Sequence, residues 1–348
     1  MALDIREELV HGCDCSNCWN QTVMAYADHF DGMRSQFELG LLRSLDLLDE
    51  SSLKEEIRYV FSMGGKRIRP LVVALAAEAV GEFSDDVLYG AVAIEILHNF
   101  TLVHDDIMDN ADTRRGKSTV HVNAGVNTAI LVGDLMMALA YDCLEKCRND
   151  RLRKGLQIFN EGVKKVCDGQ ALDESLSKSD DATMDRYVDM IAKKTGALLM
   201  AAGSLGALLG GGTERDIESL GIFGLNLGIA FQILDDMLDL EGDSERFGKP
   251  LGLDVIEKKK NFLFLKAQQM MDRSKLVIID RAYKKSLVGE VDVAAVRETY
   301  RESGIFEAAR EDVANYTQRA LSSLNMVKES DGKNALVELA NSLVTRNF

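Results

Sequence analysis

Two groups of aspartates form the most chemically informative pattern in the sequence. The first group is Asp105, Asp106 and Asp109, and the second is Asp235, Asp236 and Asp239. Residues four positions apart share one face of a helix, so the first and last carboxylates of each group project together. Like charges placed this way repel each other unless a cation lies nearby. Mg²⁺ typically binds one or two carboxylates together with water and substrate phosphates, so the pattern predicts a magnesium site.

A solvated helix end is the alternative explanation for either group, because the chain contains 56 acidic residues. Each group, however, follows an apolar helical run, at residues 94–97 and 229–231. Two copies in the same setting favour metal binding over a solvated surface. An EF-hand is excluded, since neither group has the alternating ligands or the loop glycine.

Basic residues gather near these aspartates, although the net charge of the whole chain is −15. Arginine binds phosphate oxygens in a bidentate manner and lysine adds a mobile charge, so loops that hold both suit diphosphates. Each cluster alone is also compatible with a solvated patch. Together they predict two anionic substrates side by side, one held through metal and one by direct contact. The clusters are Lys66, Arg67 and Arg69; Arg114, Arg115 and Lys117; Lys193 and Lys194; Lys249; and Lys258, Lys259 and Lys260.

The rest of the chain predicts a helical scaffold that positions these side chains. Only two prolines occur in 348 residues, where average usage would give about seventeen. Because proline interrupts helices, such a chain favours long helices and short loops. We therefore predict an all-α fold, one large helical bundle over residues 25–348, with residues 1–24 as an appendage. Helical periodicity covers residues 71–80, 87–103, 126–144, 152–167, 184–209, 217–240 and 258–271, and several segments after residue 293.

The net charge and the cysteine content exclude some classes of function for this protein. A strongly acidic chain is a poor candidate for binding nucleic acid. Six cysteines in a chain this long do not indicate a disulfide framework, so we expect reduced thiols in a cytoplasmic protein. The acidic N-terminus does not resemble a signal peptide. Residues 195–213 are uncharged, but their six glycines favour a close-packed interior helix over a membrane span.

A small cluster near the N-terminus lies outside these patterns. It comprises His11, Cys13, Cys15 and Cys18. Three thiols and an imidazole could bind zinc or respond to redox state, but the spacing is not that of a standard zinc finger. We favour a tail without a ligand.

The chain resembles the trans-isoprenyl diphosphate synthases, or short-chain polyprenyl synthetases, and most of all the archaeal geranylgeranyl type. The resemblance rests on five segments in the family's order: GGKRIRP, LVHDDIMDNADTRRGKSTVH, KKTGALL, FQILDDMLD and GKPLGLDVIEKKK. It implies a prenyltransferase with a central cavity between its helices, usually a homodimer. The implied reaction joins isopentenyl diphosphate head-to-tail to dimethylallyl, geranyl or farnesyl diphosphate after Mg²⁺ has drawn off the allylic diphosphate.

The resemblance also implies a role for each residue of these segments. Asp105, Asp109 and Asp235 would bind Mg²⁺, as three ions with substrate present, while Asp106, Asp236 and Asp239 would orient the ligands or metal-bound water. The allylic diphosphate would contact Arg114, Lys194, Gln232 and Lys249, with help from Lys258. Isopentenyl diphosphate would contact Lys66, Arg69, His98 and Arg115. Thr195 and Gln232 would present oxygens to the carbocation, although simple packing explains an isolated Thr or Gln equally well.

Product length depends on the residues one to two helical turns before the first aspartate group. Thr101 is small and lies about 5.4 Å, or one turn, below Asp105, so it should not block a growing chain. Phe100, beside it, resembles the aromatic residue of archaeal geranylgeranyl synthases, and Leu97 adds to the floor. We predict a twenty-carbon product, with fifteen or twenty-five carbons as alternatives. Phe100 is also compatible with an ordinary core position.

Two other classes of protein remain to be weighed. A class I terpene cyclase usually has an Asn/Ser/Glu-type second motif and lacks the GGKRIRP segment. A non-catalytic synthase subunit tends to lose one aspartate group, whereas this chain keeps both. The enzyme assignment requires the two aspartate groups to face each other across a cleft.

Overall fold

The computed structural model describes residues 24–147, 151–179, 181–242 and 251–344. The N-terminal cluster of His11 and three cysteines, and also Lys249, lie outside these ranges. Contacts divide the described chain into two units. The first unit holds the residues up to Val163, together with Ala201–Gly221 and Leu324–Ser342. The second holds Lys164–Met200, Ile222–Ser323 and the residues from Leu343. The expectation of a single domain over residues 25–348 stays a prediction.

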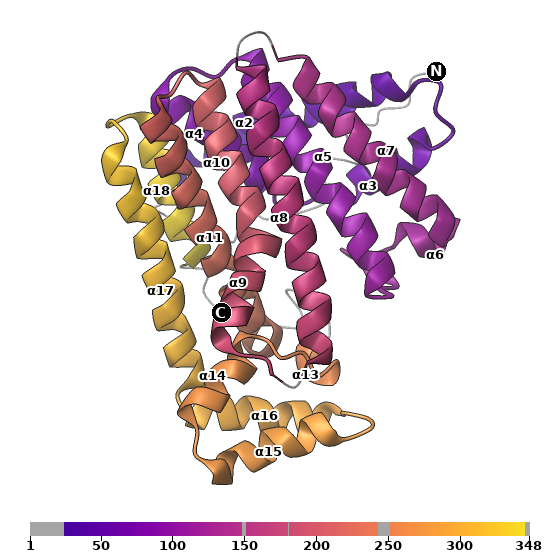
Figure 1. Ribbon diagram of the computed structural model, residues 1–348, viewed down its shortest axis with the longest axis vertical. Coiled ribbons are helices and arrows are strands. Elements are labelled where there is room, and N and C mark those ends of the chain that lie inside the picture. Colours follow the sequence, from indigo (N-terminus) through magenta and orange to yellow (C-terminus); the bar gives the residue numbers. More distant parts are fainter. Residues whose placement is uncertain (1–23, 148–150, 180, 243–250, 345–348) are drawn as a thin grey trace. The chain divides into compact units, whose positions relative to one another are not determined.

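The first unit is built around a long buried helix, α5 (Asp85–Met108). Ser84 caps its N-terminus by accepting from the amide of Val87 at 3.4 Å, and Asp85 and Asp86 suit the positive end of the helix dipole. Helices α2, α4 and α7 pack against α5 (Figure 1). The elements that begin in this unit are α2 (Met24–Ser44), α3 (Lys54–Ser62), α4 (Ile68–Val80), β1 (Thr113–Arg114), β2 (Lys117–Ser118), α6 (Val120–Ala124), α7 (Val126–Glu145) and α8 (Leu152–Lys178).

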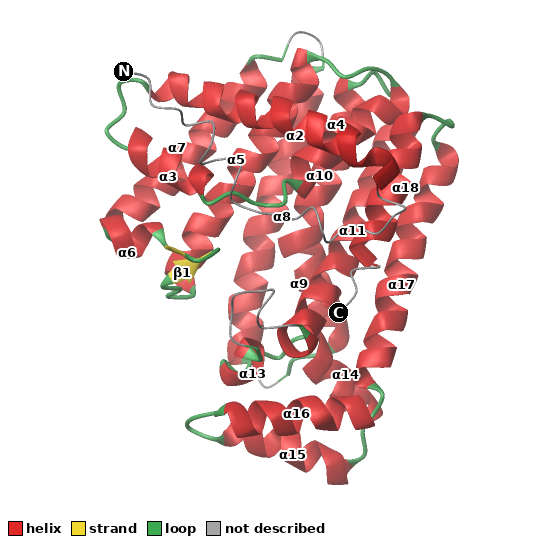
Figure 2. Ribbon diagram, turned by 180° about the vertical axis from the view of Figure 1, so that it is seen from behind, coloured by secondary structure: helices red, strands yellow, loops and turns green. Residues whose placement is uncertain are grey.

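A short hairpin follows α5 and carries the second basic cluster (Figure 2). Strands β1 and β2 pair antiparallel, with Arg114 opposite Lys117. The turn between them places Arg115 at φ 52° and Gly116 at φ 74°, both left-handed. The hairpin therefore fixes the direction of two neighbouring arginines.

The second unit has its own hydrophobic core, which includes Tyr187, Met237, Phe262 and Tyr300. Helices α9 and α17 pack against α14, and α15 packs against α16 (Figure 1). The elements that begin in this unit are α9 (Met184–Ile191), a π-helical turn η3 (Ala192–Gly196), α10 (Ala197–Leu209), α13 (Leu253–Ile256), α14 (Phe262–Met270), α15 (Arg273–Lys284), α16 (Glu290–Glu302) and α17 (Ile305–Ser323). Helices α11 (Glu214–Glu241) and α18 (Asp331–Val344) complete the described chain, with 3-10 turns at Leu45–Leu48 and Leu324–Met326.

The all-α prediction is confirmed, since the described chain is helical except for the hairpin and connecting loops. The predicted helix at residues 258–271 is wrong at its start. Lys258 is left-handed at φ 59°, and α14 begins only after Asn261, whose side chain accepts from the amide of Phe264 at 3.1 Å. An asparagine cap thus ends the loop and starts the helix.

Among the helices of the described residues, three have the length and apolar composition that a membrane crossing requires: α5, α7 and α11. Of the most apolar 18-residue stretch of each helix, 61% is buried in α5 and 67% in α11. In α7 only 39% is buried. The apolar character of α5 and α11 is therefore largely used in packing, while α7 keeps an exposed apolar side.

Candidate functional site

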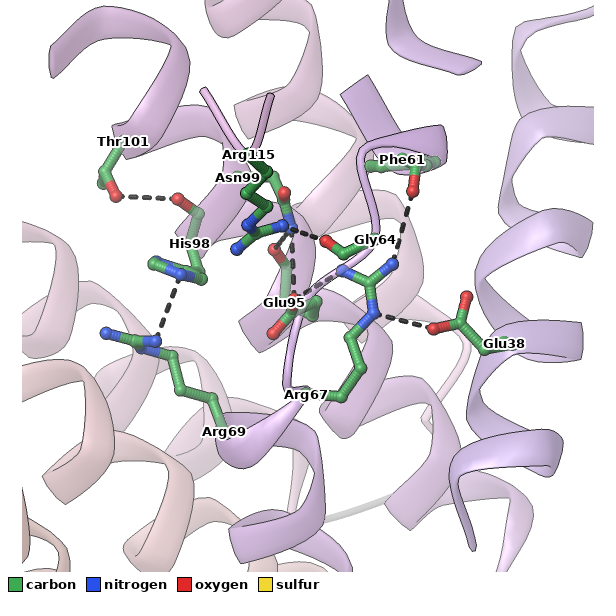
Figure 3. A network of polar contacts seen from close by, with 10 residues as sticks. All are labelled: Glu38, Phe61, Gly64, Arg67, Arg69, Glu95, His98, Asn99, Thr101 and Arg115. Atoms are coloured by element: carbon green, nitrogen blue, oxygen red, sulfur yellow. Dashed lines mark hydrogen bonds and ion pairs between the residues drawn. The ribbon is translucent and has the colours of Figure 1, made fainter. Parts of the chain in front are cut away.

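The turn before α4 separates the three cations of the first basic cluster. Arg67 has a left-handed backbone (φ 51°) and a buried side chain, 4% exposed. Its guanidinium donates to Glu95 at 2.8 Å and to Glu38 at 2.7 Å (Figure 3). Because a buried charge requires such partners, Arg67 is an internal structural residue. Lys66 is exposed beside it.

Arg69 and His98 form the next contact in the first unit. The Arg69 Nη1 atom lies 3.1 Å from His98 Nε2 (Figure 3). Burial lowers the pKa of His98 well below its usual value, and the nearby cations of Arg69 and Arg115 lower it further. The imidazole is therefore neutral, so Nε2 accepts from Arg69 and Nδ1 can donate to an anion.

Arg115 lies against the glycine turn that precedes Lys66. Its Nη1 atom donates to the carbonyl of Gly64. Gly65 has φ +146°, and a Cβ atom there would lie 2.8 Å from Arg115 Nη1. The backbone therefore favours glycine at this position, and any larger residue would displace the Arg115 guanidinium. All four residues predicted to bind isopentenyl diphosphate therefore belong to the first unit: Lys66, Arg69, His98 and Arg115. The charges of Arg69 and Arg115 both lower the pKa of His98.

In the first aspartate group, Asp106 is anchored to the hairpin. It is 4% exposed, and the Arg114 Nε atom donates to its two oxygens at 2.8 and 2.9 Å. A second nitrogen of Arg114 lies 2.7 Å from Asp106 Oδ1. Asp109 is exposed and Asp105 is half-buried. The structure therefore brings Asp106 and Arg114 together as a charge-assisted pair that positions the hairpin.

In the second group, Asp236 is anchored by neutral donors. It accepts from the hydroxyl of Tyr187, from the amide of Phe262 at 2.9 Å and from Gln232 Nε2 at 3.2 Å. Burial, and then the carboxylate of Asp254, raise the pKa of Asp236. Three donors nevertheless hold this side chain in one orientation.

Asp239 organises the loop that follows α11. Its backbone carbonyl accepts from Gly252 at 2.6 Å and its side chain accepts from the amide of Asp254 at 3.1 Å. Burial, and then Asp254, raise the pKa of Asp239 to about 6. The Asp254 carboxylate accepts in turn from Asn261 at 2.8 Å. These bonds fold the segment that carries Lys258 back onto the second aspartate group.

The two aspartate groups share one pattern of burial. In each, the second carboxylate is buried and hydrogen-bonded, while the first carboxylate is more accessible: Asp105 is half-buried and Asp235 is exposed. Within the described residues, no three His, Cys, Asp or Glu side chains form a cluster for a metal ion. This donor set fits Mg²⁺, which completes its coordination with water and substrate phosphate rather than in an all-protein cage.

The π-helical turn η3 holds Lys194 and Thr195. The Lys194 Nζ atom lies 2.6 Å from Asp173, and the hydroxyl of Thr195 donates to Gln232 Oε1 at 2.8 Å. Gln232 therefore connects Thr195 to Asp236 within the second unit. Single π turns inside α-helices often occur at functional sites, because they redirect side chains.

Lys258 lies in the loop before α14. Its Nζ atom donates to the carbonyl of Lys285. The neighbouring carbonyl of Lys259 accepts from Tyr283 at 3.0 Å. The ammonium group of Lys258 is thus held by the end of α15.

The residues predicted to set product length line α5 below the first aspartate group. Leu97 and Phe100 are buried, at 1% and 8% exposure. The Phe100 ring meets His104 edge-on with ring centres 4.8 Å apart, and His104 Nε2 lies 3.1 Å from the Ile130 carbonyl of α7. The hydroxyl of Thr101 donates to the backbone of His98 at 2.8 Å. Phe100 is therefore a packed residue on the side of α5 that meets α7.

Three residues of this site are not among those predicted from the sequence. Tyr187, Asp254 and Glu95 all hold predicted residues or their neighbours by hydrogen bonds. Asp254 lies inside the GKPLGLDVIEKKK segment, so its position was the available signal. Nothing in the sequence distinguishes Tyr187 and Glu95 from other helix residues. Only their burial in the structure identifies them as part of the site.

Comparison with known proteins identifies the family. The polyprenyl synthetase family model matches residues 50–301. The chain belongs to the polyprenyl synthetase family. It is a prenyltransferase, similar to geranylgeranyl diphosphate synthases, that condenses isoprenyl diphosphates in isoprenoid biosynthesis.

Individual relatives of this polyprenyl synthetase agree in fold and differ in product. The geranylgeranyl diphosphate synthase of Methanosarcina mazei is 35% identical over 94% of this chain and 99% of its own. The geranylfarnesyl diphosphate synthase of Natronomonas pharaonis is 32% identical over 93% and 100%. The solved geranylgeranyl pyrophosphate synthetase of Pyrococcus horikoshii has a TM-score of 0.86 and 34% identity, covering 93% of this chain and 100% of its own. The solved geranylgeranyl enzyme of Corynebacterium glutamicum, with isoprenyl diphosphate and magnesium, has a TM-score of 0.83 and 27% identity over 91% and 99%.

Replacing Tyr187 with phenylalanine is expected to lower the free energy of unfolding by about 1–3 kcal/mol, because the buried Asp236 loses a hydroxyl donor. Urea denaturation measures this difference. The matched control is Tyr141→Phe, which removes a hydroxyl that donates to the exposed Asn160. We expect that control to change stability by less than about 0.5 kcal/mol. Equal losses in both variants would mean that Asp236 does not depend on Tyr187.

Proposed function

We propose that this polyprenyl synthetase makes geranylgeranyl diphosphate by adding isopentenyl diphosphate to dimethylallyl, geranyl and farnesyl diphosphates. The single observation that carries the product assignment is the buried aromatic ring of Phe100, with the small Thr101 beside it, directly before the first aspartate group. The similarity to geranylgeranyl synthases supports it. The similarity to a geranylfarnesyl synthase makes a twenty-five-carbon product the second candidate.

Asp105, Asp109 and Asp235 are the proposed Mg²⁺ ligands, with three ions when substrate is bound. Their accessibility supports this role, because each has solvent-facing surface for a cation, water and phosphate. Mg²⁺ would supply neutralising charge to the departing diphosphate. Asp106, Asp236 and Asp239 orient the ligand-bearing helix ends, as their fixed hydrogen bonds indicate.

The allylic diphosphate is proposed to contact Arg114, Lys194, Gln232, Lys249 and Lys258. Arg114 uses two nitrogens on Asp106 and keeps further donors for a phosphate oxygen. The Lys194 side chain is 25% exposed beside Asp173, so its mobile ammonium can also reach an anion. Thr195 and Gln232 would turn oxygens toward the allylic cation, in keeping with their mutual hydrogen bond.

Isopentenyl diphosphate is proposed to bind Lys66, Arg69, His98 and Arg115. These residues supply charges from Lys66, Arg69 and Arg115 and a neutral donor from His98 Nδ1. Once the double bond has attacked the allylic cation, the new carbon–carbon bond leaves a second cation, which loses a proton to restore an alkene. A fixed diphosphate keeps the double bond at bonding distance during this step.

A Gly65→Ala substitution tests this subsite. The new Cβ would displace the Arg115 guanidinium, so we expect the KM for isopentenyl diphosphate to rise about tenfold while kcat changes little. Gly64→Ala is the control for a new side chain in this turn, because nothing lies within 4 Å of its Cβ atom. Gly64 has φ +71° and Gly65 has φ +146°, so the control carries less backbone strain. Steady-state kinetics with varied isopentenyl diphosphate measure the effect. Equal KM values in both variants would remove Arg115 from the subsite.

A cytoplasmic homodimer is the proposed form of the enzyme. The support for the homodimer is the exposed apolar surface of α6 and α7, which includes Val122, Val126, Ile130 and Leu131 at 41–55% exposure. Such a surface is costly to leave in water and is typical of a subunit contact. Analytical ultracentrifugation of the purified chain measures its assembly.

The decisive experiment for the proposed function is product chromatography. The purified chain is incubated with labelled isopentenyl diphosphate, each allylic diphosphate in turn, and Mg²⁺. A dominant twenty-carbon product supports the proposal. A dominant twenty-five-carbon product would replace it with the second candidate, and a cyclic hydrocarbon would reject chain elongation altogether.

A further inference from the structure

Helix α15 of the second unit is a local exception to the acidic character of this chain. From Arg273 to Lys285, five residues are basic and only Asp280 is acidic, in a chain with a net charge of −15. The side chains of these basic residues have no part in the proposed site. A concentrated positive segment on an acidic protein needs a separate explanation.

The geometry of α15 gathers its cations on one exposed face. Arg273, Val277, Arg281 and Lys284 follow a spacing of four, four and three residues, which places them on one side of a helix. All four are exposed, and Val277 is 60% exposed. The opposite side is buried: Ile279 is 0% exposed within the core of the second unit. Asp280, three residues after Val277 and four before Lys284, shares this face, which therefore combines three cations and one carboxylate with an apolar centre.

The loop between α15 and α16 adds two more apolar side chains. Leu287 is 83% exposed and Val291, at the start of α16, is 84% exposed. The two helices form a hairpin whose connecting loop is visible at one end (Figure 1). Lys285, beside the loop, is paired with Asp292 at 2.5 Å and is not counted among the available cations. The hairpin thus exposes apolar groups at its loop and along a basic face.

We propose that this α15–α16 hairpin docks on an anionic lipid surface. Basic side chains around exposed apolar ones are the pattern of an interfacial helix, in which cations meet lipid phosphates and apolar side chains enter the headgroup boundary. From Asp272 to Glu302 the hairpin holds seven basic and six acidic residues, so its net charge is only +1 and the positive charge is concentrated on α15. Because the chain as a whole is acidic, its approach to an anionic bilayer requires a local basic face such as this one.

Peripheral docking is distinct from the proposed function and does not require a membrane span. An isoprenyl diphosphate has a long apolar chain, which is more soluble in a bilayer than in water. An enzyme held at a lipid surface releases such a product beside its preferred solvent. Synthesis itself is expected to proceed without lipid.

Co-sedimentation of the full chain with vesicles tests the proposal. We expect binding to vesicles of phosphatidylcholine and phosphatidylserine mixed two to one, weakening with added salt, and little binding to phosphatidylcholine alone. Replacing Arg273, Arg281 and Lys284 together with glutamine should weaken partitioning about a hundredfold, at about fivefold per cation. Leu287→Ser with Val291→Ser should weaken it roughly tenfold. The matched control replaces the exposed Arg43, Arg153 and Lys328 with glutamine.

Several results would overturn the proposal. One is that the wild-type chain does not bind the anionic vesicles. Another is that the control variant loses as much binding as the triple variant. A change in sedimentation coefficient of the triple variant without vesicles would instead assign the face to contact between copies. Turnover in lipid-free buffer should be unchanged in the triple variant, which shows that it is folded. A failed product assay with intact vesicle binding would reject the proposed function and leave the docking surface standing.

Discussion

Replacing Asp105 or Asp235 with alanine is expected to lower kcat by about a thousandfold or more. Each variant removes a proposed Mg²⁺ ligand and leaves the departing diphosphate with less neutralising charge. The free energy of unfolding should change by less than about 0.5 kcal/mol, because these side chains are half-buried or exposed. Steady-state kinetics at saturating Mg²⁺ and urea denaturation measure the two quantities.

Two controls separate metal binding from folding. Asp142 is an exposed aspartate on α7, and Asp142→Ala should leave both kcat and stability unchanged. Asp106→Ala should lower the free energy of unfolding by about 2 kcal/mol, because it leaves Arg114 without its buried partner. A fully active Asp105→Ala enzyme would contradict the assignment of the first aspartate group.

Replacing Phe100 with alanine is expected to shift the main product from twenty carbons to twenty-five or more. The side chain is buried on α5 below the first aspartate group, and its removal opens space for further isoprene units. The opposite change, Thr101→Phe, should shorten the product to fifteen carbons. Chromatography of the dephosphorylated products gives the chain lengths directly.

The control for this pair addresses general loosening of the first unit. Phe100→Leu keeps most of the packing and should give an intermediate shift. Phe30→Leu, which alters another buried ring on α2, should leave product length unchanged. Identical products from wild type and Phe100→Ala would remove this residue from the floor of the pocket.

The aspartate groups could be found from the sequence because their chemistry is encoded in local spacing. A DDxxD pattern after an apolar run places carboxylates at the end of a buried helix. The first group lies at the end of α5 and the second at the end of α11. The difference in burial between the first and second aspartate of each group also follows from helical periodicity. Burying the helix face that holds the second aspartate leaves the first one toward solvent.

Other parts of the site depend on contacts that no local pattern contains. Lys66, Arg67 and Arg69 cannot be distinguished from the sequence. Arg67 can be buried because it pairs with Glu38 and Glu95, which come from two helices far from it in the sequence. The sequence predicts a helix at Lys258, since the lysines and apolar residues there fit helical periodicity, but the structure has a loop.

The π-helical turn at Lys194 shows the same limit. Its backbone passes so close to Gly169 of α8 that any side chain there would collide with it. This approach joins residues far apart in the chain, so periodicity alone predicts one continuous helix over residues 184–209. The positions of Lys194 and Thr195 therefore follow from packing within the second unit.

The contact of Arg115 with the Gly64-Gly65 turn limits how this enzyme can be re-engineered. A hairpin grafted from another synthase would keep this contact only where its loop matches the shape of the Gly64-Gly65 turn. A working chimaera must therefore exchange residues 64–67 and 113–118 as one unit. Separate swaps are expected to yield soluble enzymes that no longer saturate with isopentenyl diphosphate.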